Sequence, residues 1–460
     1  MKTTMKTTVQ AVTQAELNAL VSTRSLEPGE VYIVDGQIRR ATSTSAHQVV
    51  GGGARPLRHR GLLISDTAGG AGETVAVAST PTNGTWAVSA VDRFPATRRI
   101  VIPDANTGGT IQFTRPTSSP YCRFTADSSI VVALYIEACN SSDQLIVTVS
   151  NDAVAPTGMT NGASATLGLN ANKAPGYWFA AIDANQLSGS VTLPTMLNGV
   201  RVRVARQSGG SETRVHVCGV YVNARSKPTV LIDFDDAFLS QYTDYFPIMQ
   251  NYGLVGSVSV PYMTVGQSAG GLDTFNYADL RQLREMRDAG FAMLVHGYYP
   301  HNSAPLNSYA TILADVQANQ AFVRDNLDPR GARHYVLIAG QQHPDTDRVM
   351  RETGMLTCRG TIGEQTVELP DGPDNLYRLF STPISASAGL ADMQLKFDRA
   401  RQNGWTIRYT GHRVVDTVTD NQNEITRADW EAFCAYIAPH VASGAVDNLT
   451  VPDWYDQRFA

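Results

Sequence analysis

The spacing of apolar residues changes once along the chain, near residue 226, and this change limits the possible folds. Before it, short β-branched or alternating segments such as TVAVAS, SIVVALYIEA and TRVHVCGVYV are separated by clusters of Gly, Asn, Ser and Thr. Short strands at this spacing are typical of an antiparallel sandwich or jelly roll. After it, apolar strand-like segments alternate with amphipathic helical ones, which predicts α/β architecture. We therefore expect a multidomain protein that combines an all-β part with an α/β part.

The chain divides into three regions, as its length of 460 residues also suggests. A small module is expected over 1–53, where a GGGA segment indicates a hinge, followed by a β-sandwich over 54–225 and the α/β domain over 226–460. The β region fits a carbohydrate-binding module, a trimerisation element or a spacer. No exposed aromatic platform can be identified in the sequence, so these alternatives stay open.

Composition excludes some classes of partner. The net charge of -5 gives no reason to expect nucleic acid or an anionic membrane as a partner. No apolar run approaches the roughly 18 residues of a membrane-spanning helix, so no membrane insertion is expected. The start, MKTTMKTTVQ, lacks the apolar region of a secretory signal. Five scattered cysteines without a CxxC pair argue against a zinc knuckle or a disulfide framework and fit folding in a reducing cytosol.

Four strand-like runs after residue 226 each end in polar side chains: TVLIDFDD, FAMLVHGYYPH, YVLIAGQQH and WTIRYTGH. In parallel α/β folds the C-terminal ends of the strands meet at one rim, which carries the active site. The residues brought there would be Asp235, Asp236, His296, His301, His343 and His412. Two imidazoles and a carboxylate are the ligand set of a catalytic zinc with an open position for water. We therefore expect a divalent metal, zinc in the first place, held by Asp236, His296 and His301.

The neighbouring carboxylate and the last histidine suit proton transfer. Asp235 can stay off the metal and act as the general base, and His412, from a distant strand, suits the general acid that protonates the leaving group. A helix is expected over NYADLRQLREMRDAG, with Asn276 as its N-cap, and another after Thr426 in TRADWEAFCAYIAPHVASG. These helices would cover the sheet that carries the rim.

These segments resemble the polysaccharide deacetylases (NodB-homology domains, carbohydrate esterase family 4). IDFDDA is similar to the first motif of that family, usually written TFDDG, and the resemblance implies Asp235 as base and Asp236 as metal ligand. LRQLREMRDAGFAMLVHGYYPH is similar to the second motif, which implies His296 as a ligand, and WTIRYTGHRVVD resembles the late strand whose histidine, here His412, is the acid. The resemblance covers about 230 residues in the order of the family. It implies an irregular (β/α) barrel of NodB type.

The sequence departs from that family in three places. The second histidine of the family lies four residues after the first, where this chain has Pro300, and His301 follows one position later. VLIAGQQ replaces the Arg-Pro-Pro-Tyr segment, so the arginine that orients the base is missing, and the amide for the oxyanion is placed near Ala339. The tryptophan and aspartate of the fourth motif have no counterpart. These departures leave a degenerate, non-catalytic domain open.

The roles of four further residues stay open between function and structure. Asp233 stands where the family has a threonine, and it either orients a ligand or is a satisfied polar residue; the first interpretation is preferred. His343 is followed by Pro344 and a helix start, which favours a structural role. Tyr298 and Tyr299 either line a sugar cleft or pack in the loop.

The N-terminal segment LEPGEVYIVDGQIRRATS resembles segments near the start of bacteriophage tail-fibre and tailspike proteins. With the deacetylase resemblance, this implies a metal-dependent deacetylase of bacterial surface polysaccharide in a phage tail. The protein would assemble in the host cytoplasm, reside in the virion, bind other tail or baseplate proteins and form a homotrimer by analogy. The alternative is a receptor-binding tail adhesin that keeps a degenerate deacetylase barrel. A glycosidase would need two carboxylates across a cleft, and the sequence offers no second candidate.

Overall fold

The structure of the chain is a computed structural model. It describes residues 9–11, 31–34, 37–43, 46–52, 62–65, 74–80, 85–91, 94–105, 107–115, 117–118, 120–151, 162–169, 176–207, 211–224, 227–266, 276–297, 301, 308–360 and 376–459. Two compact units are present: one consists of Met1–Arg58, Lys227–Thr366 and Leu379–Ala460, and the other of His59–Ser226 and Val367–Arg378.

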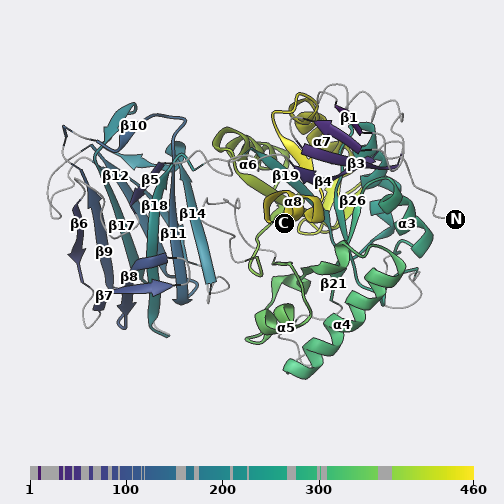
Figure 1. The fold of residues 1–460 in the computed structure, drawn as a ribbon, viewed down its shortest axis with the longest axis horizontal. Coiled ribbons are helices and arrows are strands. Elements are labelled where there is room, and N and C mark those ends of the chain that lie inside the picture. The colour runs from purple at the N-terminus through teal and green to yellow at the C-terminus, as the bar shows by residue number, and fades with distance from the viewer. Residues whose placement is uncertain are drawn as a thin grey trace. The chain divides into compact units, whose positions relative to one another are not determined.

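The second unit contains two six-stranded antiparallel sheets (Figure 1). One has the order β14-β11-β18-β8-β7, with β5 also paired to β18. Its strands are β5 (Leu62–Ser65), β7 (Thr85–Val91), β8 (Phe94–Ile102), β11 (Ser129–Ala138), β14 (Gly176–Asp183) and β18 (Thr213–Val222). The other has the order β15-β13-β12-β17-β9-β6. Its strands are β6 (Thr74–Ser79), β9 (Thr107–Thr114), β12 (Gln144–Ser150), β13 (Gly162–Gly168), β15 (Ser188–Gly189) and β17 (Gly199–Arg206). A short pair, β10 (Cys122–Phe124) and β16 (Thr195–Leu197), forms a separate two-stranded sheet, and Phe124 and Leu197 contribute to the same core.

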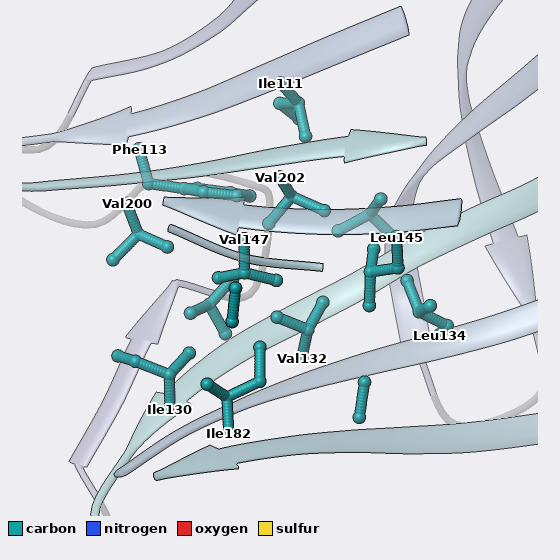
Figure 2. Close-up of a cluster of buried hydrophobic side chains, with 14 of the residues drawn as sticks. Ile111, Phe113, Ile130, Val132, Leu134, Leu145, Val147, Ile182, Val200 and Val202 are labelled. Atoms are coloured by element: carbon teal, nitrogen blue, oxygen red, sulfur yellow. The ribbon is translucent and has the colours of Figure 1, made fainter. Parts of the chain in front are cut away.

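Both sheets contribute side chains to one hydrophobic core (Figure 2). Alternate residues point to the same side of a strand, so β11 contributes Ile130, Val132 and Leu134, while β12 contributes Leu145 and Val147. All five are fully buried. Such β-branched and aliphatic side chains favour half-buried strands, and the antiparallel sheets predicted for this region are present.

In the first unit, the N-terminal strands form a small mixed sheet of order β1-β2-β3-β4. They are β1 (Val9–Ala11), β2 (Val31–Val34), β3 (Gln37–Ser43) and β4 (Ala46–Gly52). Strands β2 and β3 pair antiparallel from Val31↔Arg40 to Val34↔Gln37. This register leaves two residues, Asp and Gly, between the paired strands, as a hairpin connection requires.

The rest of the first unit is built on an eight-stranded parallel sheet, which curls into a half-barrel (Figure 1). Its order is β23-β22-β21-β20-β19-β25-β24, and β28 also pairs with β19. The strands are β19 (Thr229–Phe234), β20 (Ser257–Val260), β21 (Ala292–His296), β22 (His334–Val336), β23 (Thr357–Arg359), β24 (Thr382–Ile384), β25 (Thr406–Gly411) and β28 (Asp447–Leu449). Within the described part of the chain, the two sides of the opening share an isolated bridge, Arg359↔Leu379. The parallel α/β part is thus present as a half-barrel.

Helices lie between these strands and pack their apolar side chains against the sheet. They are α2 (Phe246–Asn251), α3 (Leu280–Asp288), α4 (Tyr309–Asn326), α5 (Thr346–Glu352), α6 (Leu390–Asn403), α7 (Arg427–Ala442) and α8 (Val451–Phe459). Across the described helices, none has both the length and the apolar character needed to cross a membrane.

Two helix starts test the predicted caps. The prediction of Asn276 as a cap is wrong: α3 begins after Asp279, whose carboxylate accepts a hydrogen bond from the Gln282 amide in a capping box. Asp279 satisfies an otherwise unpaired N–H of the first turn, which Asn276 lies too early in the chain to reach. The cap of α7 is confirmed, because Thr426 accepts from the Asp429 amide. Trp430, on the first turn of that helix, is fully buried.

Candidate active site

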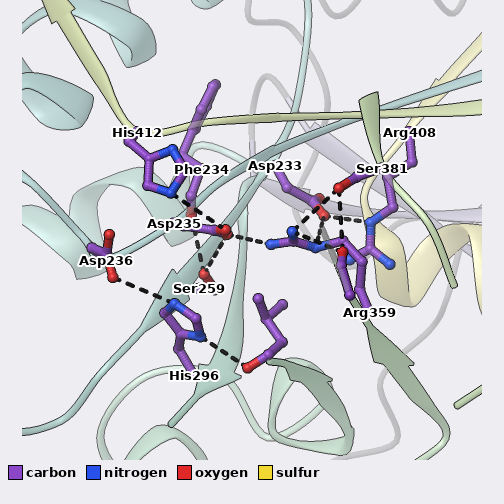
Figure 3. Close-up of polar contacts among 12 residues, drawn as sticks. Asp233, Phe234, Asp235, Asp236, Ser259, His296, Arg359, Ser381, Arg408 and His412 are labelled. Atoms are coloured by element: carbon purple, nitrogen blue, oxygen red, sulfur yellow. Dashed lines mark hydrogen bonds and ion pairs between the residues drawn. The ribbon is translucent and has the colours of Figure 1, made fainter. Parts of the chain in front are cut away.

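The C-terminal ends of β19, β21 and β25 bring their polar residues together, as the parallel topology requires (Figure 3). Asp235 and Asp236 follow β19 directly, His296 is the last residue of β21, and His412 follows β25. A pocket of about 510 Å³ opens over them. Its lining consists of Asp235, Asp236, Phe238, His296, Ile338, Ala339, Ser381, Pro383, Thr410, His412, Arg413, Asp420, Gln422 and Asn423.

Asp235 is held as a buried carboxylate at the base of the pocket. It accepts a 2.8 Å hydrogen bond from Ser259 Oγ on β20, and the guanidinium of Arg359 donates to the same oxygen. Burial alone raises the pKa of Asp235, but the charges of Arg359, then His296 and His412, outweigh it and hold the pKa below its usual range. The carboxylate is therefore ionised at neutral pH, and Oδ2 is the oxygen that neither of these two donors contacts.

His412 faces the other oxygen of this carboxylate. Its Nε2 lies 3.9 Å from Asp235 Oδ2, and its side chain is 26% exposed, so the imidazole reaches the pocket. A partly exposed imidazole near a fixed carboxylate can give a proton to a group bound in the pocket and recover it from solvent.

Arg359 is a site residue that sequence reasoning missed. The sequence predicts that the arginine orienting the base is absent, but Arg359, at the end of β23, contacts Asp235 and is fully buried. Its Nη1 also lies 3.3 Å from Ser381 Oγ. The signal was present in LTCRG, where a strand-like run again ends in a polar residue. The strand has only three residues, too few for a pattern of alternation to stand out.

Asp233 lies below the pocket and contacts two arginines. Arg408, on β25, donates Nε to Asp233 Oδ2, and Arg359 Nε lies 3.7 Å from the same oxygen. Figure 3 shows Asp233 and Asp235 on either side of the Arg359 guanidinium. Asp233 is fully buried and does not line the pocket, so any effect it has on the reaction is indirect, through Arg359, Arg408 or its charge beside Asp235.

Asp236 and His296 are placed to share a cation. The His296 ring nitrogen Nδ1 donates to the Val336 carbonyl at 2.9 Å, so Nε2 is the nitrogen that faces Asp236 Oδ1, at 3.4 Å. A proton on Nε2 is shared with this carboxylate, and a bound metal would take the place of that proton. Tetrahedral zinc with bonds of about 2.0–2.1 Å keeps two of its donors about 3.3 Å apart. These two residues therefore fit a zinc-like metal. Burial lowers the pKa of His296, but the hydrogen bond and charge of Asp236, with that of Asp235, outweigh it and raise this pKa.

His301 does not join them. Its Nδ1 is 3.0 Å from Thr346 Oγ1, its Nε2 is 3.0 Å from Tyr335 Oη, and the side chain is buried. With both ring nitrogens hydrogen-bonded, no lone pair is free for a metal, so these contacts argue against the prediction of His301 as the third ligand. Burial also lowers the pKa of His301 to about 4, so the ring is neutral. The described residues contain no group of three His, Cys, Asp or Glu side chains that could hold a metal.

The other predicted residues have mainly local contacts or lie elsewhere. His343 caps its own turn: its backbone N–H donates to Thr346 Oγ1, and its Nδ1 accepts from the Asp345 amide. Tyr298 and Tyr299 lie outside the described residues. Ala339 lines the pocket, as expected for an oxyanion donor, and has a φ of 51°.

Backbone strain gathers at this rim. Asp236 and Ala237 have φ values of 74° and 56°, and with Ala339 they are three of the four described non-glycine residues with positive φ. Such conformations cost of order 1 kcal/mol or more each and cluster at functional sites. The positive φ of Asp236 turns the chain after β19, so the carboxylates of Asp235 and Asp236 point in different directions.

The wall of the pocket beyond His412 was not predicted. It consists of Arg413, Asp420, Gln422 and Asn423, from β26 (Arg413–Val415) and the loop before β27 (Glu424–Thr426). Arg413 pairs with Glu424 at 2.8 Å and stands over the Phe238 ring at 5.7 Å. These residues belong to a polar loop that carries no sequence pattern.

Known proteins give weak matches. No protein-family profile matches the chain, and no curated protein matches it. Among solved structures, a Mycobacterium smegmatis protein assigned as a polysaccharide deacetylase is 13% identical, with a TM-score of 0.38, and covers 51% of this chain and 91% of its own. A family 4 carbohydrate esterase from Streptomyces lividans is 13% identical (TM-score 0.29; 48% and 91%), and the BpsB deacetylase domain from Bordetella bronchiseptica is 18% identical (TM-score 0.28; 39% and 71%). These structural neighbours are described as deacetylases or as a family 4 carbohydrate esterase, and they match about two-fifths to one half of the chain.

Proposed function

We propose that the unit containing the half-barrel is a hydrolase that removes acetyl groups from polysaccharide. One observation carries this proposal: a carboxylate that Arg359 keeps ionised, Asp235, lies 3.9 Å from His412 in a pocket that also holds the Asp236–His296 pair. A base, an acid and a cation-binding pair converge on one space large enough for an acetylated sugar unit.

Each residue of the site has a different role in the proposed hydrolysis. Asp235 takes a proton from the attacking water, and His412 donates a proton to the departing amine or alcohol as acetate leaves. Asp236 and His296 would hold the metal, for which zinc is the best fit, and a bound metal supplies Lewis-acid polarisation of the acetyl carbonyl. Arg359 keeps Asp235 ionised and in place, and a backbone amide near Ala339 would stabilise the oxyanion.

The wider proposal rests on the sequence resemblances. The bacterial surface polysaccharide would be the substrate, in capsule or O-antigen, and the protein would be part of a phage tail in the virion. The N-terminal strands would attach it to other tail or baseplate proteins, and the antiparallel unit would be a β-sandwich for carbohydrate binding or for trimerisation. A homotrimer is the proposed assembly.

The contacts of His301 favour a second candidate, a tail adhesin that binds glycan without turnover. A binding protein can leave both nitrogens of His301 bonded to Thr346 and Tyr335, since it needs no third ligand. It gains nothing, however, from an ionised carboxylate opposite an accessible imidazole.

Acetate release distinguishes the two candidates. Purified full-length chain is incubated with acetylated bacterial polysaccharide, with added Zn²⁺ or with chelator, beside His412→Asn and the control His440→Asn, whose histidine lies near the end of α7. If the protein is a hydrolase, the wild type releases acetate with zinc and His440→Asn releases it at the same rate. The rate of acetate release by His412→Asn is lower by about a hundredfold or more. Absence of acetate release from every polysaccharide, together with binding to one of them, establishes the adhesin instead.

A further inference from the structure

One buried side-chain amide, that of Gln241, joins the backbones of the two residues assigned to proton transfer. Its Nε2 donates to the carbonyl oxygen of Asp235 and, at 2.9 Å, to that of His412. Because both partners are carbonyl oxygens, the NH₂ end of the amide must be the end that faces them. Gln241 is 1% exposed and does not line the pocket.

These two bonds lie where the sheet stops. The parallel pairing of β19 with β25 runs from Thr229↔Thr406 to Phe234↔Gly411, and the Asp235 amide still donates to the Gly411 carbonyl at 2.9 Å. Among the residues that the structure describes, the pairing of these two strands ends there. The Gln241 amide takes the next two carbonyls, so it extends the connection between the strands by one residue on each side.

The local fold is shaped to place this amide. Gln241 opens a short π-helix, Gln241–Tyr245, four positions after Ala237, which with Asp236 has a positive φ. π-helical turns are rare and occur often at functional sites. The other end of the amide, Oε1, is buried without a hydrogen-bond partner. A buried amide oxygen without a partner is unfavourable, so in this orientation the amide satisfies the two carbonyls at the expense of its own oxygen.

We propose that Gln241 is a positioning residue that sets the separation between the base and the acid. Asp235 and His412 lie on different strands, and their side chains, 3.9 Å apart at Nε2 and Oδ2, have no direct hydrogen bond to fix them. The amide holds both backbones just where the side chains depart. This inference rests on the proposed hydrolase.

The chain offers a matched control in Gln320, on α4. Its Nε2 also donates to two backbone carbonyls, those of Ala332 and Thr353, both at 3.1 Å, and it does not line the pocket. Gln241→Met and Gln320→Met each remove two donors and keep a side chain of similar length. Both variants lose stability, whereas only Gln241→Met disturbs the base and acid.

The experiment measures kcat and KM for acetate release and determines crystal structures of the wild type and both variants. Gln241→Met lowers kcat about tenfold to a hundredfold with KM near that of the wild type, since displacements of about 1 Å have effects of this size. Gln320→Met keeps kcat within about twofold. Should Gln241→Met not fold, Gln241→Asn, whose shorter amide cannot span both carbonyls, takes its place.

Equal kcat values for the two methionine variants would overturn the proposal while leaving the hydrolase intact. A wild type that releases no acetate refutes the hydrolase, and the crystal structures then decide on Gln241 alone. In that case only the geometric part of the proposal is tested: it is supported if the His412–Asp235 separation changes in Gln241→Met but not in Gln320→Met, and it is refuted if the separation is the same in all three.

Discussion

Replacing Arg359 by methionine tests the electrostatic basis of the site. Arg359 is fully buried, donates to Asp235 and lies 3.7 Å from Asp233. Methionine has similar length but no charge or donor. In the variant, Asp233 keeps its ion pair with Arg408. Of the two side-chain donors to Asp235 named above, only the Ser259 hydroxyl remains. The substitution therefore leaves one carboxylate, 2% exposed, without its guanidinium.

The expected loss is large because the remaining charge stays buried. Removing one partner of a buried ion pair typically costs about 3–5 kcal/mol. For a unit of this size each kcal/mol lowers Tm by about 2–4 °C, so Arg359→Met should melt roughly 6–20 °C below the wild type at pH 7. The control is Arg281→Met, because Arg281 pairs with Glu285 on an exposed helix surface, and its melting temperature should stay close to that of the wild type.

The pH dependence of this stability difference tests the direction of the pKa shift of Asp235. Arg359 holds the pKa of Asp235 below the ordinary value of about 3.9, so its contribution to stability is complete above that pH and is lost as the pH falls. The difference in Tm between wild type and Arg359→Met should therefore be present in full at pH 7 and 5 and smaller at pH 3, below the ordinary pKa of the carboxyl group. Scanning calorimetry at pH 7, 5 and 3 measures it. A variant that melts within a degree or two of the wild type at pH 7 would show that the ion pair does not stabilise the site as the structure indicates.

Two further substitutions test the metal pair and the core of the antiparallel unit. His296→Ala should retain less than one equivalent of zinc after dialysis against trace metal, measured by mass spectrometry, whereas His440→Ala should retain the wild-type amount. Equal zinc retention by the two variants would show that His296 is not a metal ligand. Phe113→Ala, at a fully buried core position, should destabilise its unit by about 3–5 kcal/mol in calorimetry, while Met196→Ala, at a side chain 46% exposed, should change it far less; equal losses would contradict the burial seen here.

The sequence predicted the meeting of Asp235, Asp236, His296 and His412 because a parallel sheet sends all its strand ends to one rim. That inference needs only the strand positions, which apolar runs mark well. The contacts of His301 were beyond reach, since its partners Tyr335 and Thr346 lie 34 and 45 positions further along the chain. The packing of α5 and β22 decides which hydroxyl groups bond to the His301 ring, and no local sequence pattern predicts that packing.

The order of strands was similarly out of reach. Strand β28, near the C-terminus, pairs with β19. Strand β25 also pairs with β19, although more than half of the residues of the unit lie between these two strands in the sequence. Arg408 and Arg359 reach Asp233 and Asp235, at the end of β19, from different strands only because of this order. The sequence shows three carboxylates at one strand end, but the compensating arginines are visible only once the sheet is assembled.

The assembled charges explain why three carboxylates can end one strand. Arg408 and Arg359 balance Asp233 and Asp235, which are buried and lie within the same cluster of contacts. Asp236 is the remaining carboxylate; its side chain is 27% exposed, and it faces the imidazole of His296. Its negative charge is the one in this group that neither arginine balances, so a cation at this rim is favoured beside Asp236 and His296. A cation placed beside Asp235 would instead compete with Arg359. The charge balance therefore separates the two adjacent aspartates into a cation-binding residue and a proton acceptor, the division that hydrolysis requires.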